Sequence, residues 1–201
     1  MEENAAFEAS NTRRRGRKMR KIAQWIVALA MLSMNLLSFA QSQAGQIAQE
    51  TVFRAPFDLK LHIDKNHYYE QHFDKVPYII DNDVYLFVGE NFGVNVTVID
   101  NQITGLTYQP NLNKCDISFK FTQEKLNKNE MMMILVTRNG LKRRLQFDAL
   151  MTIPDKKGIF NTSILPIEPG LSSFESWPHP IVQLVLRNFR FVESSPAVPR
   201  N

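Results

Sequence analysis

Three histidines in this 201-residue chain recur every five residues, at His62, His67 and His72, and imidazole is a common metal ligand. Residues five apart lie on opposite faces of a continuous strand, so the three rings would converge only where the chain bends. The acidic string Asp81-Asn82-Asp83 lacks the central glycine and terminal glutamate of a calcium-binding loop. We interpret these residues as surface histidines and turn acids, and we expect neither a metal nor a cofactor.

Ser172, Ser173, Glu175 and His179 lie close together in the sequence and include the residue types of a hydrolytic triad. A triad is defined by its geometry and by the roles of its members, so closeness in the sequence is weak support. The chain contains no nucleophile elbow, phosphate-binding glycine loop or His-Glu-x-x-His motif. An enzyme built on this segment is therefore the third of three hypotheses, and the first two are non-enzymatic.

Trp177-Pro178-His179-Pro180 is the most unusual string, because two prolines stiffen the backbone around an aromatic ring and an imidazole. Trp177, presented on a rigid loop with His179 beside it, is a candidate anchor for a partner protein. The alternative is that Trp177 closes one end of the core while the prolines end strand pairing at a sheet edge.

A second group of candidate contact residues surrounds a predicted turn at Asn139-Gly140. Its members are Met131, Met133, Leu135, Arg138, Lys142 and Arg144. The cations are suited to an anionic lipid surface or an acidic protein, and methionine is suited to an adaptable contact surface. The alternative is a solvated rim of cations above methionines that fill the core.

The stretch from Met131 to Met151 consists of two apolar-rich runs joined at Asn139-Gly140. Asn-Gly between such runs is the strongest short signal for a hairpin, because both central residues of a type I′ turn need positive φ. This turn predicts a register in which Val136 pairs with Arg143 and Ile134 with Leu145. The first strand is apolar on both faces, which predicts a central strand in a sheet covered on both sides.

Alternation with a period of two recurs along the rest of the body, and turn residues follow about every 8–12 residues. The ranges 57–63, 84–88, 92–100, 103–108, 115–121 and 159–165 are expected strands, and 166–177 is an expected long loop. Residues 180–192 fit a strand better than the alternative helix. Gly89-Glu90 followed by Val94, Val96 and Val98 resembles the first strands of immunoglobulin-like bacterial envelope domains. We expect an all-β fold, a single antiparallel immunoglobulin-like β-sandwich of about nine strands.

The N-terminal segment has the pattern of an export signal. Arg20-Lys21 precede an apolar run from Ile22 to Phe39, and small residues follow. This pattern predicts a secretory signal peptide within residues 1–44, cut after Ala40 or Ala44. The alternative is an uncleaved single-span anchor in the inner membrane. A start at Met19 would give a more ordinary leader, so we expect translation to begin there.

The positive charge of the chain belongs to this leader. Residues 1–44 contain seven Lys or Arg and three Asp or Glu, which leaves 17 of each sign in residues 45–201. A neutral body lacks the net positive charge that binding to a phosphate backbone needs, so nucleic acid is not an expected partner. The single cysteine, Cys115, cannot form an internal disulfide, so an apolar core must provide the stability.

These observations predict a linker over residues 45–56, the sandwich domain over 57–193 and a disordered tail over 194–201. The leading hypothesis is an exported, non-enzymatic protein that contacts envelope proteins in the periplasm or at the outer-membrane periphery, as an accessory subunit of an envelope or secretion assembly. Membrane contact would come only from the leader or from the basic patch. The second hypothesis is a module that binds a glycan or another small ligand through Trp177, Tyr68, Tyr69 and Tyr78.

Overall fold

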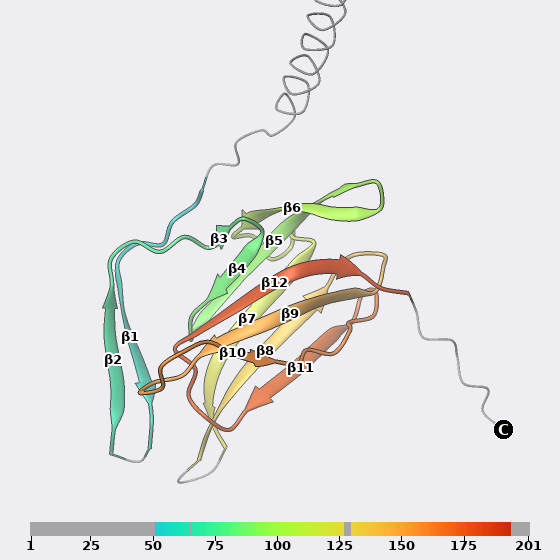
Figure 1. Ribbon diagram of the computed structural model, residues 1–201. Helices are drawn as coiled ribbons and strands as arrows, with labels where there is room; N and C mark the ends of the chain where they lie inside the picture. Colours follow the sequence, from blue (N-terminus) through green and yellow to red (C-terminus); the bar gives the residue numbers. More distant parts are fainter. Residues whose placement is uncertain (1–50, 65, 127–129, 194–201) are drawn as a thin grey trace, which may run out of the picture. The chain divides into compact units, whose positions relative to one another are not determined.

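The computed structural model describes residues 51–64, 66–126 and 130–193. This part of the chain contains twelve strands and no helix, and all of its strand pairs are antiparallel (Figure 1). The predicted all-β, antiparallel architecture is therefore confirmed. The expected number of about nine strands is too low, because three short or irregular segments also pair.

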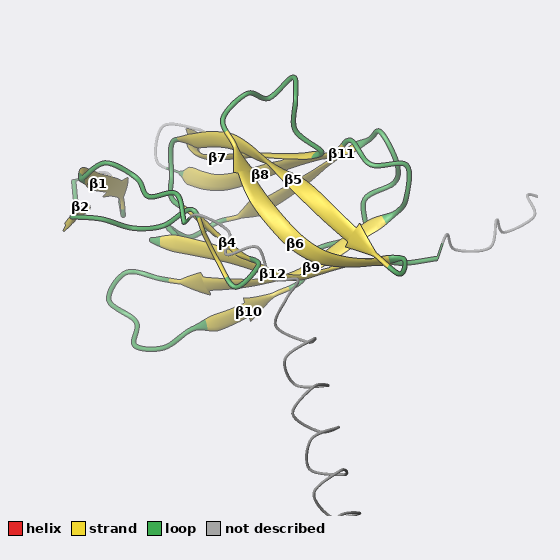
Figure 2. Ribbon diagram, turned by 90° about the horizontal axis from the view of Figure 1, so that it is seen from above, coloured by secondary structure: helices red, strands yellow, loops and turns green. Residues whose placement is uncertain are grey.

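Two five-stranded sheets pack face to face in a sandwich-like arrangement (Figure 2). The first sheet has the order β10 (Phe160–Thr162), β9 (Leu145–Thr152), β12 (Gln183–Phe191), β4 (Asp83–Leu86) and β3 (Ile79–Ile80). The second has the order β11 (Ser172–Trp177), β8 (Met131–Asn139), β7 (Ile117–Lys125), β5 (Glu90–Ile99) and β6 (Gln102–Gln109). A separate hairpin consists of β1 (Phe57–His62) and β2 (Tyr68–Phe73).

Aromatic side chains from the two sheets meet in the core. The ring of Phe119 on β7 lies 6.3 Å from that of Phe147 on β9 and 6.2 Å from that of Phe189 on β12, between ring centroids. Phe189 faces inward because a bulge interrupts the β12–β9 register, with Asn188 at φ 55°. The strand expected over residues 180–192 is thus confirmed, and the bulge accounts for its irregular apolar spacing.

The predicted hairpin at Asn139-Gly140 is wrong. β8 pairs with β7 and β11 in one sheet, whereas β9 pairs with β10 and β12 in the other, so the connection crosses between the sheets. Neither Asn139 nor Gly140 has a positive φ. The buried Asn139 amide donates to the carbonyl oxygens of Arg143 (2.8 Å) and Ile167 (3.0 Å) and so fixes the crossing. The expected strands 84–88 and 92–100, although neighbours in the sequence, also do not pair with each other, because β4 and β5 belong to different sheets.

Two Asp-Asn dipeptides form the hairpin turns that the Asn-Gly dipeptide does not. Asp81 and Asn82 (φ 49° and 66°) join β3 to β4, and Asp100 and Asn101 (φ 48° and 66°) join β5 to β6. Positive φ at both central residues is the signature of a type I′ turn. Asp and Asn tolerate this region better than other non-glycine residues because their short polar side chains bond locally.

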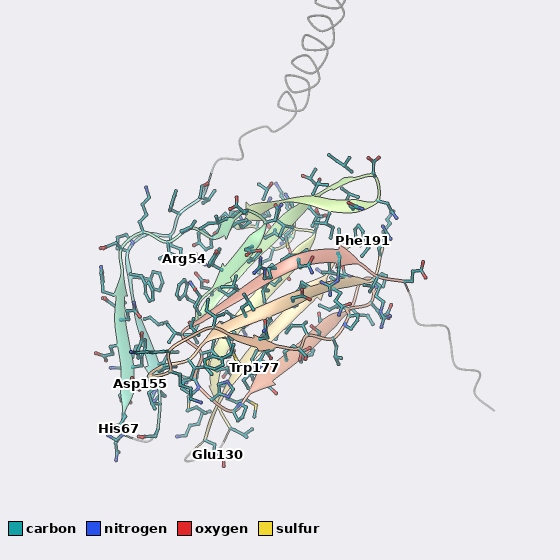
Figure 3. The ribbon with its side chains drawn as sticks, in the orientation of Figure 1. Arg54, His67, Glu130, Asp155, Trp177 and Phe191 are labelled. Carbon is teal, nitrogen blue, oxygen red and sulfur yellow. The ribbon has the colours of Figure 1, made fainter. Side chains whose placement is uncertain are left out.

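Part of the expected linker belongs to the folded domain. Arg54 is 5 % exposed, and its guanidinium pairs with both carboxylate oxygens of Glu90 and donates to the carbonyl of Pro77 at 2.6 Å (Figure 3). The Arg54 N–H donates to the Val76 carbonyl at 2.9 Å. The ring of Tyr78 lies 4.0 Å from the guanidinium carbon. The domain therefore begins before residue 57, at the segment that contains Arg54.

The β1–β2 hairpin packs against the main body through one apolar face. Leu61 is fully buried, and the side-chain amide of Gln123 on β7 bonds both the N–H and the carbonyl of His62, at 2.9 and 2.8 Å. Phe73 of β2 lies 4.8 Å from Phe87, between ring centroids. These contacts hold the hairpin across one end of the two sheets.

The predicted leader (residues 1–44), its cleavage sites after Ala40 and Ala44, the start at Met19 and the tail over 194–201 all lie outside the described residues. Within the described part of the chain, no helix has the length and apolar character needed to cross a bilayer.

Candidate functional site

The outermost strand of the second sheet, β11, has a free edge. It pairs with β8 from Ser172 opposite Arg138 to Trp177 opposite Met133. The Asn139 N–H donates to the Leu171 carbonyl at 2.9 Å, which sets the alternation of bonded pairs along this ladder. Ser172, Phe174 and Ser176 then point their N–H and C=O groups away from β8, and no described residue bonds these groups.

Apolar side chains lie beside this edge on the outer face of the sheet. Phe174 is 73 % exposed, and its cross-strand neighbour Val136 and the next outward residue on β8, Ile134, are half-buried. We use the name β8–β11 surface for Ile134, Val136, Arg138, Ser172, Phe174 and Ser176. An extended strand that paired with β11 would cover Phe174 and gain the unused backbone bonds at the same time.

Cations stand at one end of the β8–β11 surface. Arg138 and Lys142 are both exposed, and neither forms an ion pair with a described residue. Arg144 was predicted to join them, but it pairs with Glu168 at 2.8 Å and donates to the Glu193 carbonyl at 3.1 Å. Arg138 and Lys142 therefore remain available to an acidic group, whereas Arg144 stabilises the domain itself.

At the opposite edge of the second sheet, two backbone groups of β6 are occupied by a side chain. The side chain of Asn82, in the β3–β4 turn, donates to the Thr104 carbonyl of β6 at 3.2 Å and accepts from the Leu106 N–H at 2.9 Å. Natural sheets also protect free edges with lysine, proline or bulges. β11 contains no lysine or proline and has no register shift, and its one charged residue, Glu175, lies on the inner face opposite Leu135. The outward-pointing backbone groups of β11 have no partner among the described residues.

The other predicted contact residues are placed mainly in the core. Trp177 is 7 % exposed and donates its indole N–H to the Thr162 hydroxyl at 2.8 Å, which supports the alternative that it closes the sandwich (Figure 3). Met133 and Leu135 face inward from β8 and are fully buried, so neither can meet a partner. Met131 is half-buried at the start of the same strand.

No match to a known protein was found for this chain, whether it was compared with protein-family models, with curated proteins or with solved structures. The function must therefore be argued from the chemistry of the described surfaces.

The residues of the hypothetical triad are not brought together. Ser172 and Ser173 face opposite sides of β11, and Glu175 accepts a hydrogen bond from the Leu165 N–H at 3.2 Å. Burial, and then the nearby charge of Lys156, lowers the pKa of His179, whose Nε2 has no hydrogen-bond partner among the described residues. The present geometry thus lacks the nucleophile–base contact on which this chemistry depends.

The three histidines do not converge. His67 contacts Asp64 at 2.7 Å, His72 contacts Asp58 at 2.7 Å, and His62 packs on the ring of Tyr68. No group of three or more potential metal-binding side chains occurs in the described part of the chain. Cys115 is half-buried, its thiol donates to the Leu112 carbonyl at 3.3 Å, and burial raises its pKa.

Sequence reasoning missed Phe174, because residues 166–177 were expected to form a loop. The alternation that could have revealed β11 is present in the sequence, where Ser172, Phe174 and Ser176 alternate with Ser173, Glu175 and Trp177. The prolines and glycine just before this segment concealed a six-residue strand inside what reads as a long loop.

Proposed function

We propose that this protein is an exported, non-enzymatic, immunoglobulin-like module of the bacterial cell envelope that binds an extended segment of a partner protein by strand addition at β11. The observation that carries the proposal is the coincidence of an unpaired strand edge with the exposed ring of Phe174. The proposal of export rests on the leader pattern of residues 1–44. The zero net charge of residues 45–201 argues against nucleic acid as a partner.

The chemistry of the surface defines the segment that would bind. Backbone bonds to Ser172, Phe174 and Ser176 require an extended chain without proline at the bonded positions. The apolar outer face, with Val136 and Phe174, favours an apolar residue at alternate positions. Arg138 and Lys142 favour an acidic residue at the end next to Ser172.

Photo-crosslinking in the envelope tests this proposal. A photoreactive phenylalanine analogue at position 174 should crosslink to one discrete partner in cells. The matched control carries the analogue at Ile99, an apolar side chain that is 57 % exposed at the β5–β6 turn. We expect no discrete crosslink from position 99.

The backbone part of the proposal is tested by Ser176→Pro. The N–H of Ser176 points away from β8, so proline there removes a free donor without removing a β8–β11 bond. In size exclusion of gently solubilised envelopes, the tagged wild-type chain should elute with a stoichiometric partner and the variant should elute alone. A wild-type chain that elutes as a lone monomer and gives no crosslink at position 174 would exclude this function.

A further inference from the structure

The free edge of β11 has the same pattern of residues on both sides of Phe174. Ser172 and Ser176 lie two positions before and two positions after it, and these three residues direct their N–H and C=O groups away from β8. β11 is the last strand of its sheet on this side (Figure 1). A second β11 that runs antiparallel beside the first therefore presents the same side chains and backbone groups in reverse order.

One antiparallel register uses all of these backbone groups. When Phe174 of one copy lies opposite Phe174 of the other, Ser172 lies opposite Ser176 of the second copy, and each such pair exchanges two hydrogen bonds. The three free N–H groups of each copy then donate to the other copy, which gives six bonds for the two chains. A register centred on Glu175 would form fewer of these bonds and would set two carboxylates directly opposite each other, which is destabilising.

The register centred on Phe174 also joins two polar side chains on the inner face of β11. The Ser173 hydroxyl is shielded from solvent and has no hydrogen-bond partner among the described residues. It lies opposite Glu175 of the second copy, in a pair whose Cα atoms approach to about 4.5 Å. Oε1 of Glu175 accepts from the Leu165 N–H, whereas no described residue bonds its Oε2. A hydroxyl that is unpaired in one chain thus gains an acceptor in two.

Exposed apolar side chains gather beside this edge. Phe174, Leu171 just before the strand, and Leu165, whose N–H bonds Glu175, are among the most exposed apolar residues of the described chain. In the register centred on Phe174, the two Phe174 rings share the outer face with their Cα atoms about 5.5 Å apart, a separation that allows ring contact. An edge of six residues per copy is a small interface, so we expect association to be reversible and to depend on concentration.

We propose that two copies of this chain pair antiparallel through β11 about a twofold axis at Phe174, and that this dimer competes with the partner segment for the same edge. A twofold contact uses the one edge of each copy, so association stops at the dimer. The dimer does not depend on the partner, whereas the competition rests on the proposed strand addition. The second copy covers the edge before the partner segment binds, and the segment covers it afterwards.

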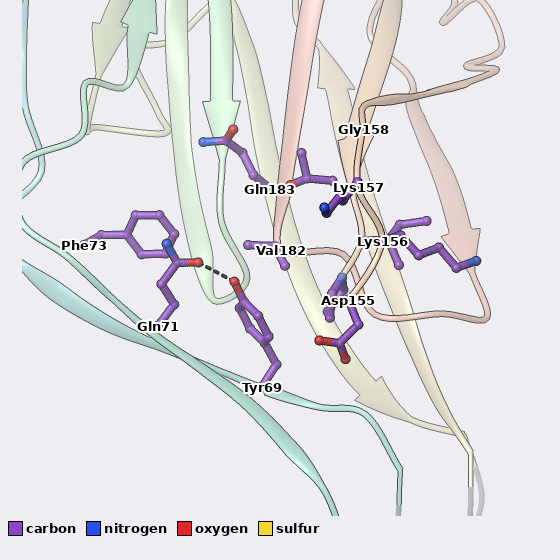
Figure 4. Close-up of a pocket in the computed structure, with 12 residues that line it drawn as sticks. Tyr69, Gln71, Phe73, Asp155, Lys156, Lys157, Gly158, Val182 and Gln183 are labelled. Atoms are coloured by element: carbon purple, nitrogen blue, oxygen red, sulfur yellow. Dashed lines mark hydrogen bonds between the residues drawn. The ribbon is translucent and has the colours of Figure 1, made fainter.

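A hollow of about 510 Å³ beside β2 is the rival surface for association (Figure 4). Gln71 on β2, Val182 just before β12 and Asp155 in the turn between β9 and β10 belong to its lining. Asp155 faces the hollow, whereas Lys156 extends away from it. Charged residues are depleted at the cores of protein interfaces, so the hollow suits a second copy less well than the edge of β11 does.

Single cysteines test the register in the full-length chain, held in a mild detergent and carrying Cys115→Ser to remove the native thiol. With oxidised glutathione, Phe174→Cys should give a disulfide-linked dimer, because about 5.5 Å between Cα atoms suits a disulfide. Ser172→Cys alone and Ser176→Cys alone are the matched controls. Each places its two thiols more than about 13 Å apart and should stay unlinked. Ser172→Cys/Ser176→Cys in one chain should link, because these positions lie opposite each other.

Analytical ultracentrifugation measures the association without a crosslink. The wild-type chain should change from monomer to dimer as its concentration rises, with no larger species. Phe174→Ala removes both rings from the dimer and Ser173→Ala removes two hydrogen bonds, so each should raise the dimer Kd at least about tenfold. Ile99→Ala removes an exposed apolar side chain at the β5–β6 turn, and Gln71→Ala changes the hollow beside β2. Both are matched controls that should leave the Kd unchanged.

Three results would overturn the dimer: a monomer at every concentration, a cysteine at position 172 or 176 that links alone, or a wild-type Kd in Ser173→Ala. An effect of Gln71→Ala as large as that of Phe174→Ala would move the contact to the hollow and overturn it as well. The envelope crosslink from position 174 separates the dimer from the proposed function. A product that contains only this chain supports the dimer, and a product that contains another protein supports strand addition. A complex in which the partner and the β11-linked pair of copies occur together would refute the competition.

Discussion

Replacing Glu90 with alanine should leave the Arg54 guanidinium buried without its counter-ion. Removing one partner of a buried ion pair typically costs about 3–5 kcal/mol, because the remaining charge keeps its desolvation penalty. The lower end applies here, since the side chain of Glu90 is 17 % exposed and Arg54 keeps its bonds to the Pro77 and Tyr85 carbonyls. We expect a loss of about 3 kcal/mol in the free energy of unfolding.

The complementary variant, Arg54→Met, keeps the length of the side chain and removes its charge. It leaves Glu90 bonded to the Phe87 N–H at 2.8 Å, but it frees two carbonyl oxygens, so a loss of about 3 kcal/mol is again expected. In the double variant Arg54→Met/Glu90→Ala no buried charge remains. Its loss should therefore fall short of the sum of the two single losses by about 2 kcal/mol.

Urea unfolding, followed by the fluorescence of the buried Trp177, measures these free energies. The matched control is Glu70→Ala, which breaks an exposed ion pair with Lys60 on the β1–β2 hairpin and should cause no measurable loss. If Glu90→Ala matched this control, or if the two single losses added up to the double loss, the assignment of Arg54 as an anchor of the N-terminal segment would be refuted.

Three further predictions follow from single residues. A Cβ at Gly140 would lie 2.7 Å from the Asp116 carbonyl oxygen, so Gly140→Ala should lower the urea midpoint by an amount that corresponds to about 1–3 kcal/mol. Burial lowers the pKa of His179 in the folded protein from 6.5, so the contribution of this residue to stability is fully present above that pH and is lost as the pH falls through the folded-state pKa. The free energy of unfolding, measured by urea unfolding across this range, should therefore fall less on acidification in His179→Asn than in the wild type. Burial raises the pKa of Cys115 above 9.0, so iodoacetamide should label the folded protein more slowly than the urea-unfolded chain at mildly alkaline pH.

The alternation of polar and apolar residues predicts which segments form strands better than it predicts which strands pair. The strand over 183–191 was identified correctly, because its β-branched and aromatic residues outweighed a weak helical spacing. The strand pairing across Asn139-Gly140 was predicted wrongly, because the φ preferences of a dipeptide describe only a local turn. The partners of the Asn139 amide include Ile167, and this long-range bond decides that the chain crosses between the sheets.

The candidate contact surface was predicted only in part, for a related reason. Both faces of β8 are apolar, so the sequence pattern cannot tell whether Met133 and Leu135 or Ile134 and Val136 face the core. The packing of β8 opposite the first sheet resolves this choice in favour of Met133 and Leu135. The exposed cations Arg138 and Lys142 were identified from the sequence, because local turn chemistry and charge are sufficient to place them at the surface.

The open edge of β11 has a consequence for the protein in the absence of a partner. An unpaired edge beside an exposed aromatic ring pairs with any suitable extended chain, including a second copy of the same strand. Stability does not require this edge to be open, because a polar side chain can occupy backbone groups of an edge strand, as Asn82 does for two groups of β6. If a partner segment normally covers β11, the isolated wild-type chain should associate with itself as its concentration rises. Ser176→Pro should abolish that association together with partner binding, because both depend on the same backbone groups.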